Sequence, residues 1–289
     1  MIDAHHHLWD LQAVHYPWLM ERGGERFFGD PTSIQRNYLQ PEFIAEAGAE
    51  GITASVHVQV GAEDGLAEAT WVDAQHQMNP AYPAAQVAFC DLTDPERARA
   101  LDALQELPTV RGIRQITGRK PKEDAKLGTH ALLETDSYYT GLDELATRGL
   151  SYDIQLIPEQ MQRLAQAFAE RPSLQVALCH AGSPYDRSDA GLATWRAGIS
   201  AMAACPNVVC KISGFGMFDP DWTKERIAPF VAHILAEFGA ERALFGSNFP
   251  VDKIFAPYAQ MTDAVRDLVP EADLKAVFET TAQRFYRLG

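Results

Sequence analysis

The sequence predicts a single domain of the α/β class, a (β/α)8 barrel that spans residues 1–289. The length suits this fold, which typically needs about 250 residues. Short apolar runs alternate with longer amphipathic segments along the whole chain, as expected for strands and helices around a parallel sheet. Eight such pairs fit a closed barrel better than an open sheet.

The predicted elements follow from this alternation. The expected strands are residues 2–7, 51–60, 84–90, 109–116, 150–157, 174–180, 208–213 and 242–247. The expected helices are residues 41–49, 62–78, 94–106, 141–148, 158–170, 190–204, 223–238 and 258–268. Many of the strands are apolar on both faces, as buried parallel strands are. No glycine-rich dinucleotide motif and no Walker loop follows a strand, which disfavours nucleotide-binding folds.

Two connections, residues 8–40 and 117–140, are too long to be simple links. Both follow a strand, so both should emerge at the carboxyl end of the barrel, where barrel enzymes keep their chemistry. The first is rich in aromatic residues and includes Trp18, and the second carries basic residues that include Arg119. The alternative is that both connections are surface loops without a role in the site. We expect them to cover a site and to contact substrate through Trp18 and Arg119.

Composition narrows the classes of partner. The net charge of −14 disfavours nucleic acid and anionic membranes, which would be repelled. No signal-peptide pattern and no apolar run of about 18 residues is present. The four cysteines are sparse and read as free buried thiols, which fits a cytoplasmic protein. We therefore expect a small-molecule substrate, with a homodimer left open.

Histidines stand where two apolar strands end. The first strand ends in three histidines, and alternation turns His5 and His7 to one side and His6 to the other. His5 and His7 could bind a divalent metal or donate hydrogen bonds to a carbonyl oxygen. His180 closes the sixth strand. Although a lone histidine is more often structural, these positions favour a catalytic role.

Two cations and one amide occupy other strands. Arg114 lies in the fourth strand and Lys211 in the seventh, both between apolar residues. Burying an unpaired cation is costly, so each either pairs with a structural acid or binds oxygen atoms of a substrate. Gln59 ends the second strand and could line the barrel mouth. We assign Arg114, Lys211 and Gln59 to substrate binding, while His57 could equally face the helices.

The eighth strand ends in an amide where a hydrolase would want a base. Asn248 cannot take a proton from water near neutral pH. Asp252 follows four residues later and could reach back into the mouth, or else cap the next helix or pair with Lys253. We include both Asn248 and Asp252 among the candidate catalytic residues.

Several motifs together resemble the lactonase branch of the amidohydrolase superfamily, the amidohydrolase 2 type, which includes L-fuconolactonase-like and L-rhamnonolactonase-like enzymes. The resemblance covers the full length, and the opening motif is the most specific. The motifs are Asp-Ala-His-His-His-Leu-Trp-Asp at residues 3–10, Tyr-Pro-Trp-Leu at 16–19, Val-Arg-Gly-Ile-Arg-Gln at 110–115, His-Ala-Gly at 180–182, Lys-Ile-Ser-Gly at 211–214, Leu-Phe-Gly-Ser at 244–247 and Gln-Arg-Phe-Tyr at 283–286.

The resemblance implies a distorted barrel that hydrolyses a lactone. It implies that His5 and His7 match the family's first-strand histidines, His180 its sixth-strand histidine and Arg114 its fourth-strand arginine. It also implies either no metal or a single divalent ion such as Zn²⁺, held by His5 and His7. No obligatory cofactor is expected, and a two-metal site is disfavoured because residues 150–157 contain no histidine.

The chain departs from the family at Asn248, where most members have the aspartate that activates water. Another base, namely Asp252, His7 or His180, could replace it, and we favour this reading. The chemistry could instead be decarboxylation or lactone isomerisation on the same barrel, or the barrel could only bind a ligand. Our leading hypothesis is hydrolysis of a sugar-acid or carboxylate-bearing lactone.

Overall fold

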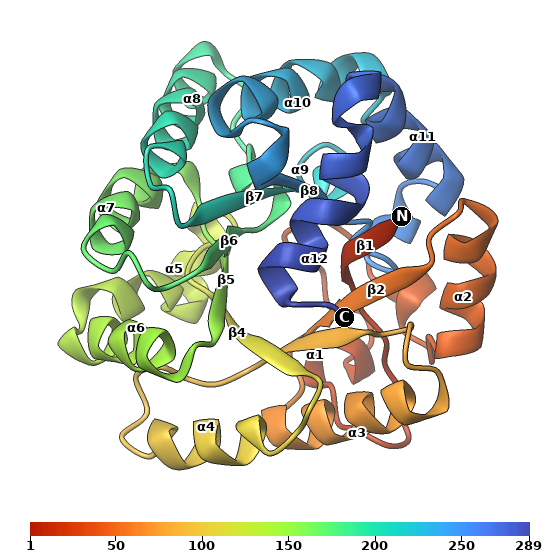
Figure 1. The fold of residues 1–289 in the computed structure, drawn as a ribbon, viewed down its shortest axis with the longest axis vertical. Helices are drawn as coiled ribbons and strands as arrows, with labels where there is room; N and C mark the ends of the chain where they lie inside the picture. The colour runs from red at the N-terminus through yellow and green to blue at the C-terminus, as the bar shows by residue number, and fades with distance from the viewer.

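The computed structural model describes residues 1–289 apart from the side chain of His130. Its eight strands are all parallel, and they follow one another around a barrel in chain order (Figure 1). The strands are β1 (Ile2–His6), β2 (Ala54–Val58), β3 (Ala85–Ala88), β4 (Val110–Ile116), β5 (Ser151–Gln155), β6 (Val176–Leu178), β7 (Val208–Ile212) and β8 (Ala243–Phe245). The predicted barrel and all eight predicted strands are confirmed, with ends that differ by a few residues.

The α-helices lie outside the barrel, most of them around its strands (Figure 1). They are α1 (Pro17–Met20), α2 (Gln40–Ala49), α3 (Gly65–Met78), α4 (Arg97–Gln105), α5 (Pro121–Leu127), α6 (Asp136–Arg148), α7 (Pro158–Ala169), α8 (Asp189–Ala203), α9 (Phe215–Phe218), α10 (Lys224–Phe238), α11 (Tyr258–Leu268) and α12 (Thr281–Tyr286). The eight predicted helices correspond to α2, α3, α4, α6, α7, α8, α10 and α11.

The connection at residues 117–140 is more regular than we predicted. It contains α5, a 3-10 helix at Thr129–Glu134 and the first turn of α6. Helix α5 lacks an apolar stripe, so the hydrophobic pattern did not predict it. However, Pro121 lies in its first turn, and Gly128 ends it in the left-handed region at a φ of 69°. These are ordinary start and stop signals for a helix.

Backbone hydrogen bonds at the end of β8 close the barrel onto β1. The amide of Asn248 donates to the carbonyl of His5 over 2.7 Å, and the amide of His7 donates to the carbonyl of Phe249 over 2.7 Å. Gly246 permits this approach, because a Cβ atom there would lie 2.6 Å from the Cβ of His5. The closure therefore places the first-strand histidines beside Asn248.

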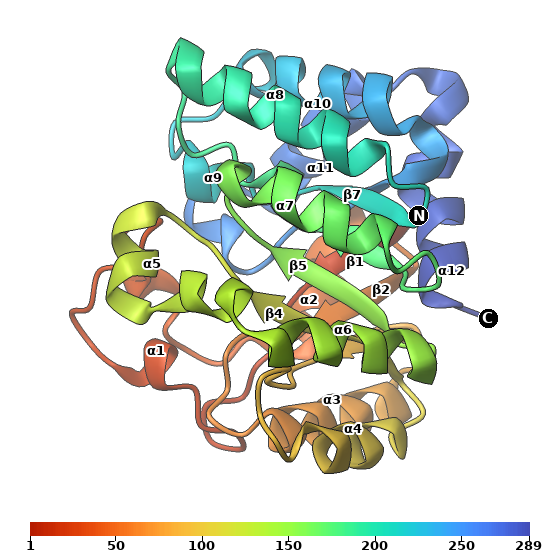
Figure 2. The same ribbon diagram turned by 90° about the vertical axis from the view of Figure 1, so that its left-hand side faces the viewer.

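The two ends of the barrel differ. Phe285 and Tyr286 of α12 pack onto the small apolar residues that fill the barrel interior, among them Ala4, Val56 and Val209. Figure 2 shows α12 at one end of the strands and α1, α5 and α9 at the other. The amino end is thus closed by α12, and the long connections gather at the carboxyl end, as predicted.

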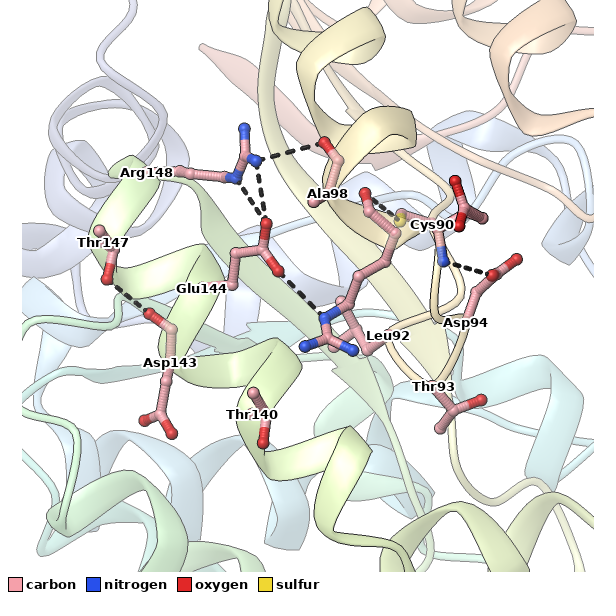
Figure 3. A network of polar contacts seen from close by, with 12 residues as sticks. Cys90, Leu92, Thr93, Asp94, Ala98, Thr140, Asp143, Glu144, Thr147 and Arg148 are labelled. Atoms are coloured by element: carbon pink, nitrogen blue, oxygen red, sulfur yellow. Dashed lines mark hydrogen bonds and ion pairs between the residues drawn. The ribbon is translucent and has the colours of Figure 1, made fainter.

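Ion pairs tie neighbouring outer helices together (Figure 3). Arg148 of α6 donates to Glu144 over 2.9 Å and to the carbonyl of Ala98 in α4 over 3.2 Å. Arg97 of α4 also donates to Glu144, over 3.0 Å. This network lies on the outer layer of the barrel, where it joins α4 to α6. Within the described part of the chain, no helix combines the length and apolar character needed to cross a bilayer.

Candidate active site

Strand alternation sorts the three histidines of the first strand. The His6 ring stacks on Phe43 of α2 at 3.9 Å between ring centroids, so it faces the helices. His5 and His7 turn the other way, and the ring of His5 lies 4.5 Å from that of His180 and 5.2 Å from that of His7. The structure therefore brings the three predicted histidines together at the carboxyl ends of β1 and β6.

A cavity of about 410 Å³ opens above this cluster. The polar residues of its floor come from the ends of six strands, and they are His7, Gln59, Arg114, Gln155, His180 and Asn248. Its wall comes largely from the two long connections and includes Trp18, Arg26, Phe27, Phe28, Arg119 and Glu123. The predicted residues Gln59, Trp18 and Arg119 thus lie at the cavity, while His57 faces Glu68 of α3 at 3.7 Å.

Arg114 is the buried cation of the floor. It donates to the carbonyl of Gln59 over 3.0 Å, to Oε1 of Gln155 over 2.6 Å and to Nε2 of His180 over 3.4 Å. All three partners are uncharged, and its Nε has no partner among the described residues. Of the two roles left open for Arg114, this geometry favours binding a substrate oxygen over pairing with a structural acid.

Lys211 is placed differently from our expectation. Its ammonium group contacts Asp153 at 2.5 Å, the carbonyl of Ala4 at 3.0 Å and Nδ1 of His5 at 3.1 Å. The side chain is fully buried and does not line the cavity. Because three partners use its three N–H groups, Lys211 is a structural cation that supports His5, and we correct its assignment to substrate binding.

A hydrogen-bonded chain joins His7 to Asp252 through Asn248. Nδ1 of His7 lies 2.6 Å from the carbonyl of Val58, so this nitrogen must carry a proton. Nε2 of His7 lies 3.2 Å from the side-chain amide of Asn248, and the same amide contacts Asp252 over 2.8 Å. Asp252 also accepts from the amide of Gly216 in α9 over 2.9 Å. Asp252 itself does not line the cavity and lies behind Asn248.

The orientation of the Asn248 amide decides where one proton of this chain resides. With its oxygen toward His7, both nitrogens of His7 must donate, so His7 is a cation and Asp252 an anion. Rotated by 180°, the amide donates to Nε2, and its oxygen faces a protonated Asp252. Burial raises the pKa of Asp252 to about 7 and lowers the pKa of His7 well below its usual range. Burial thus favours the neutral arrangement, in which Nε2 of His7 is unprotonated and accepts a hydrogen bond from the Asn248 amide.

Comparison with known proteins identifies the family. The family model described as Amidohydrolase matches residues 2–288. The chain belongs to the amidohydrolase family. It is therefore a hydrolase, as the sequence predicted, and lactonase-named relatives agree with this class.

Relatives and solved structures align with this amidohydrolase over nearly its whole length. The protein y4mH of Sinorhizobium fredii is 35% identical, over 100% of this chain and 98% of y4mH. An L-fucono-1,5-lactonase of Burkholderia multivorans is 28% identical, over 99% of this chain and 96% of that protein. A crystal structure of a Burkholderia multivorans amidohydrolase with bound HEPES superposes with a TM-score of 0.83 at 27% identity, over 100% and 99% of the two chains. A second crystal form of a Burkholderia multivorans amidohydrolase contains zinc.

The histidines of this amidohydrolase do not fit a divalent metal. Lys211 donates to Nδ1 of His5, which places the proton of a neutral His5 on Nε2. Arg114 donates to Nε2 of His180, so that lone pair is already used. Two cations within hydrogen-bonding distance of the imidazoles also repel a metal ion. Among the described residues, no group of three or more His, Cys, Asp or Glu side chains has metal-binding geometry. The donor set argues against the zinc site that His5 and His7 suggested.

Asp252 should make stability depend on pH. Its folded pKa of about 7 lies above the ordinary 3.8 because burial disfavours the charged form, so the folded state binds the extra proton. The contribution of Asp252 to the free energy of unfolding is therefore fully present below about pH 4, and it is lost as the pH rises through about 7. We expect the free energy of unfolding of the native protein, relative to Asp252→Asn, to fall from pH 5 to pH 8 in urea titrations. The buried histidines titrate in both proteins, so a pH-independent difference would contradict this assignment.

Several residues that line the cavity were not among the predicted site residues, and three of them are polar or charged groups near the floor or wall, namely Gln155, Arg26 and Glu123. Gln155 is the last residue of β5, and its position at a strand end is the signal that identified Gln59, although Ser151 and Asp153 make this strand less apolar. Arg26 and Glu123 also line the cavity, but they lie outside the strands. Strand-end patterns could not have found them, because their positions depend on how the two connections fold over the barrel.

Proposed function

We propose that this amidohydrolase opens a lactone by hydrolysis without a metal ion, the lactone being that of a sugar acid or one that bears a carboxylate. The buried guanidinium of Arg114, whose hydrogen bonds end on uncharged partners beside His7 and His180, is the observation that carries the proposal. Relatives named L-fucono-1,5-lactonase at 26–28% identity support a lactone as the substrate class.

In this proposal Arg114 binds the carbonyl oxygen of the lactone. Guanidinium N–H groups stabilise the negative charge that develops on that oxygen as water attacks, and they do so without reorganisation because Gln59, Gln155 and His180 hold the guanidinium in place. His180 is itself oriented by Ser213, which lies 3.1 Å from its Nδ1. His5 packs against His180 and supports its position.

His7 supplies the proton transfers. Its Nε2 gives up the 3.2 Å hydrogen bond from the Asn248 amide and takes a proton from water while the water oxygen bonds to the carbonyl carbon. The tetrahedral intermediate then collapses, the bond between the carbonyl carbon and the ring oxygen breaks, and Nε2 of His7 returns the proton to that oxygen. The product is an open-chain hydroxy acid. Asn248 and Asp252 orient the His7 ring and set its basicity, although Asp252 does not contact the attacking water. This arrangement takes the place of a carboxylate that would contact the water directly.

A panel of five- and six-membered lactones tests the function. The expected result is stoichiometric acid release, followed with a pH indicator, together with an open-chain hydroxy acid identified by NMR. Release of CO₂ would instead indicate a decarboxylase, and a new lactone without acid would indicate an isomerase. If lactones raise the melting temperature but none is converted, the protein is a binding barrel.

Chelation tests the metal-independent part of the proposal. We expect kcat to be unchanged after dialysis against EDTA and dipicolinate, because Arg114 rather than a cation polarises the carbonyl. The metal content of the active preparation should be far below one ion per chain by elemental analysis. Loss of activity on chelation, with recovery on addition of Zn²⁺, would refute a metal-free mechanism.

A further inference from the structure

We infer that the cavity selects lactones that carry a carboxylate on an otherwise apolar ring, and that Arg119 binds this carboxylate. The inference rests on the proposed lactone hydrolysis and narrows its substrate class. The charges of the cavity favour an anion. Its charged lining residues are three arginines, Arg26, Arg114 and Arg119, and one acid, Glu123. This excess of positive charge is local, because the whole chain carries a net charge of −14.

Arg119 is an arginine of the cavity wall whose charge is only loosely matched within the protein. Its backbone amide donates to both carboxylate oxygens of Asp124 over 2.9 Å, which fixes the residue at the start of α5. Its guanidinium is only loosely paired, with Nε 4.0 Å from Glu123. Its NH1 is buried and has no partner among the described residues. A buried guanidinium nitrogen without a partner is costly unless a ligand supplies an oxygen.

The other two arginines already have roles. Arg26 donates to the carbonyl of Trp18 over 2.9 Å and to Glu21 over 3.3 Å, so its charge is partly matched. Arg114 lies on the floor beside the histidines, where the carbonyl would bind. Arg119 therefore remains for a second oxygen group of the substrate, and its planar fork suits a carboxylate.

The rest of the cavity wall offers few hydrogen-bonding groups to a polyhydroxylated ring. Trp18, Phe27, Phe28 and Phe89 present apolar surface to the cavity.

Each of the glutamines nearby already makes at least one hydrogen bond within the protein. Gln59 binds the amide of Gly61 at 2.8 Å, and Gln155 binds Arg114. Gln115 binds Asp91 at 3.2 Å. Hydroxyl groups of a sugar lactone would lose hydrogen bonds to water with few replacements, whereas a flat apolar ring would not.

The test compares two lactones that differ only in charge. We would measure kcat/KM for 5-oxotetrahydrofuran-2-carboxylate and for its carboxamide, each corrected for spontaneous hydrolysis, with L-fucono-1,5-lactone as the polyhydroxylated comparison. In the native protein we expect the carboxylate to exceed both other lactones by about 30-fold or more. In Arg119→Gln we expect the carboxylate-to-carboxamide ratio to fall at least tenfold, while Lys122→Gln, which removes an exposed charge of the adjacent helix α5, keeps it.

The outcomes separate this inference from the proposed function. Hydrolysis of the carboxamide or of L-fucono-1,5-lactone at rates equal to or above those of the carboxylate would overturn the inference and leave lactone hydrolysis standing. A native ratio that survives Arg119→Gln would overturn the role of Arg119. If no lactone is hydrolysed, calorimetric binding of the carboxylate but not the carboxamide, lost in Arg119→Gln, would support the anion site alone. Equal binding of both would refute it.

Discussion

Replacing Arg114 by methionine is expected to lower kcat/KM for lactone hydrolysis by about 100- to 1,000-fold, the usual cost of losing an oxyanion donor. The physical reason is the position of the guanidinium, which is buried and hydrogen-bonded only to Gln59, Gln155 and His180. Methionine keeps much of the volume but offers no N–H group to the developing oxyanion. The measurement is steady-state hydrolysis of the best lactone of the panel, with circular dichroism to verify folding.

Two further variants make the result specific. Arg114→Lys keeps the charge but cannot donate in three directions from a planar group, so it should recover only a small part of the activity. Arg111→Met removes an arginine from the same strand that donates to the carbonyl of Pro108, outside the cavity, and it should change kcat/KM less than twofold. If Arg114→Met and Arg111→Met had similar activities, Arg114 would not be the group that binds the carbonyl.

Most of the fold followed from the sequence because its signal is repeated eight times. Each strand is a short apolar run, each following helix has a polar face, and the errors are confined to element ends and to segments without an apolar stripe, such as α5. The short helix α12 was missed because a single helix at the amino end interrupts the βα alternation. Its role in covering the barrel interior depends on tertiary packing of Phe285 and Tyr286, which no local pattern displays.

The site was predicted less evenly, and Arg114 and Lys211 illustrate the reason. Both are cations within apolar strands, and the sequence argument assigned them the same role. Alternation along a strand tells which side chains point into a barrel, but it does not tell how deep they lie. Arg114 reaches the cavity at the carboxyl end, whereas Lys211 lies below His5 and meets Asp153 of β5. The depth follows from strand tilt and register, which are set by the closed barrel.

The role of Asn248 could not be predicted from the sequence for a different reason. The sequence identified the missing carboxylate and named Asp252, His7 and His180 as substitutes. The structure connects two of these three through Asn248 itself, since the amide contacts both His7 and Asp252. Asn248 also sits in the left-handed region at a φ of 57°, which asparagine tolerates better than most residues. A spacing of four residues alone could not predict that both contacts would use the same amide.

Replacing Lys211 by methionine is expected to lower the free energy of unfolding by about 3–5 kcal/mol, because it leaves Asp153 as a buried carboxylate without its cation. Tyr286 would still donate to Asp153 over 2.7 Å, but a neutral donor does not replace an ammonium group. His5 would lose the donor to its Nδ1 at the same time. Urea unfolding, followed by fluorescence and circular dichroism, measures the change.

The double replacement Lys211→Met with Asp153→Asn decides whether the loss comes from the unpaired charge. Each single variant leaves one charge buried without its partner, so both should be strongly destabilised. The double variant removes both charges, and it should be more stable than either single variant, with a coupling energy above about 1 kcal/mol in the cycle. Additive losses would mean that Lys211 stabilises the barrel through its contacts with Ala4 and His5 rather than through Asp153. If the double variant instead recovers stability but has lost catalysis, the contribution of Lys211 to catalysis lies in the orientation of His5.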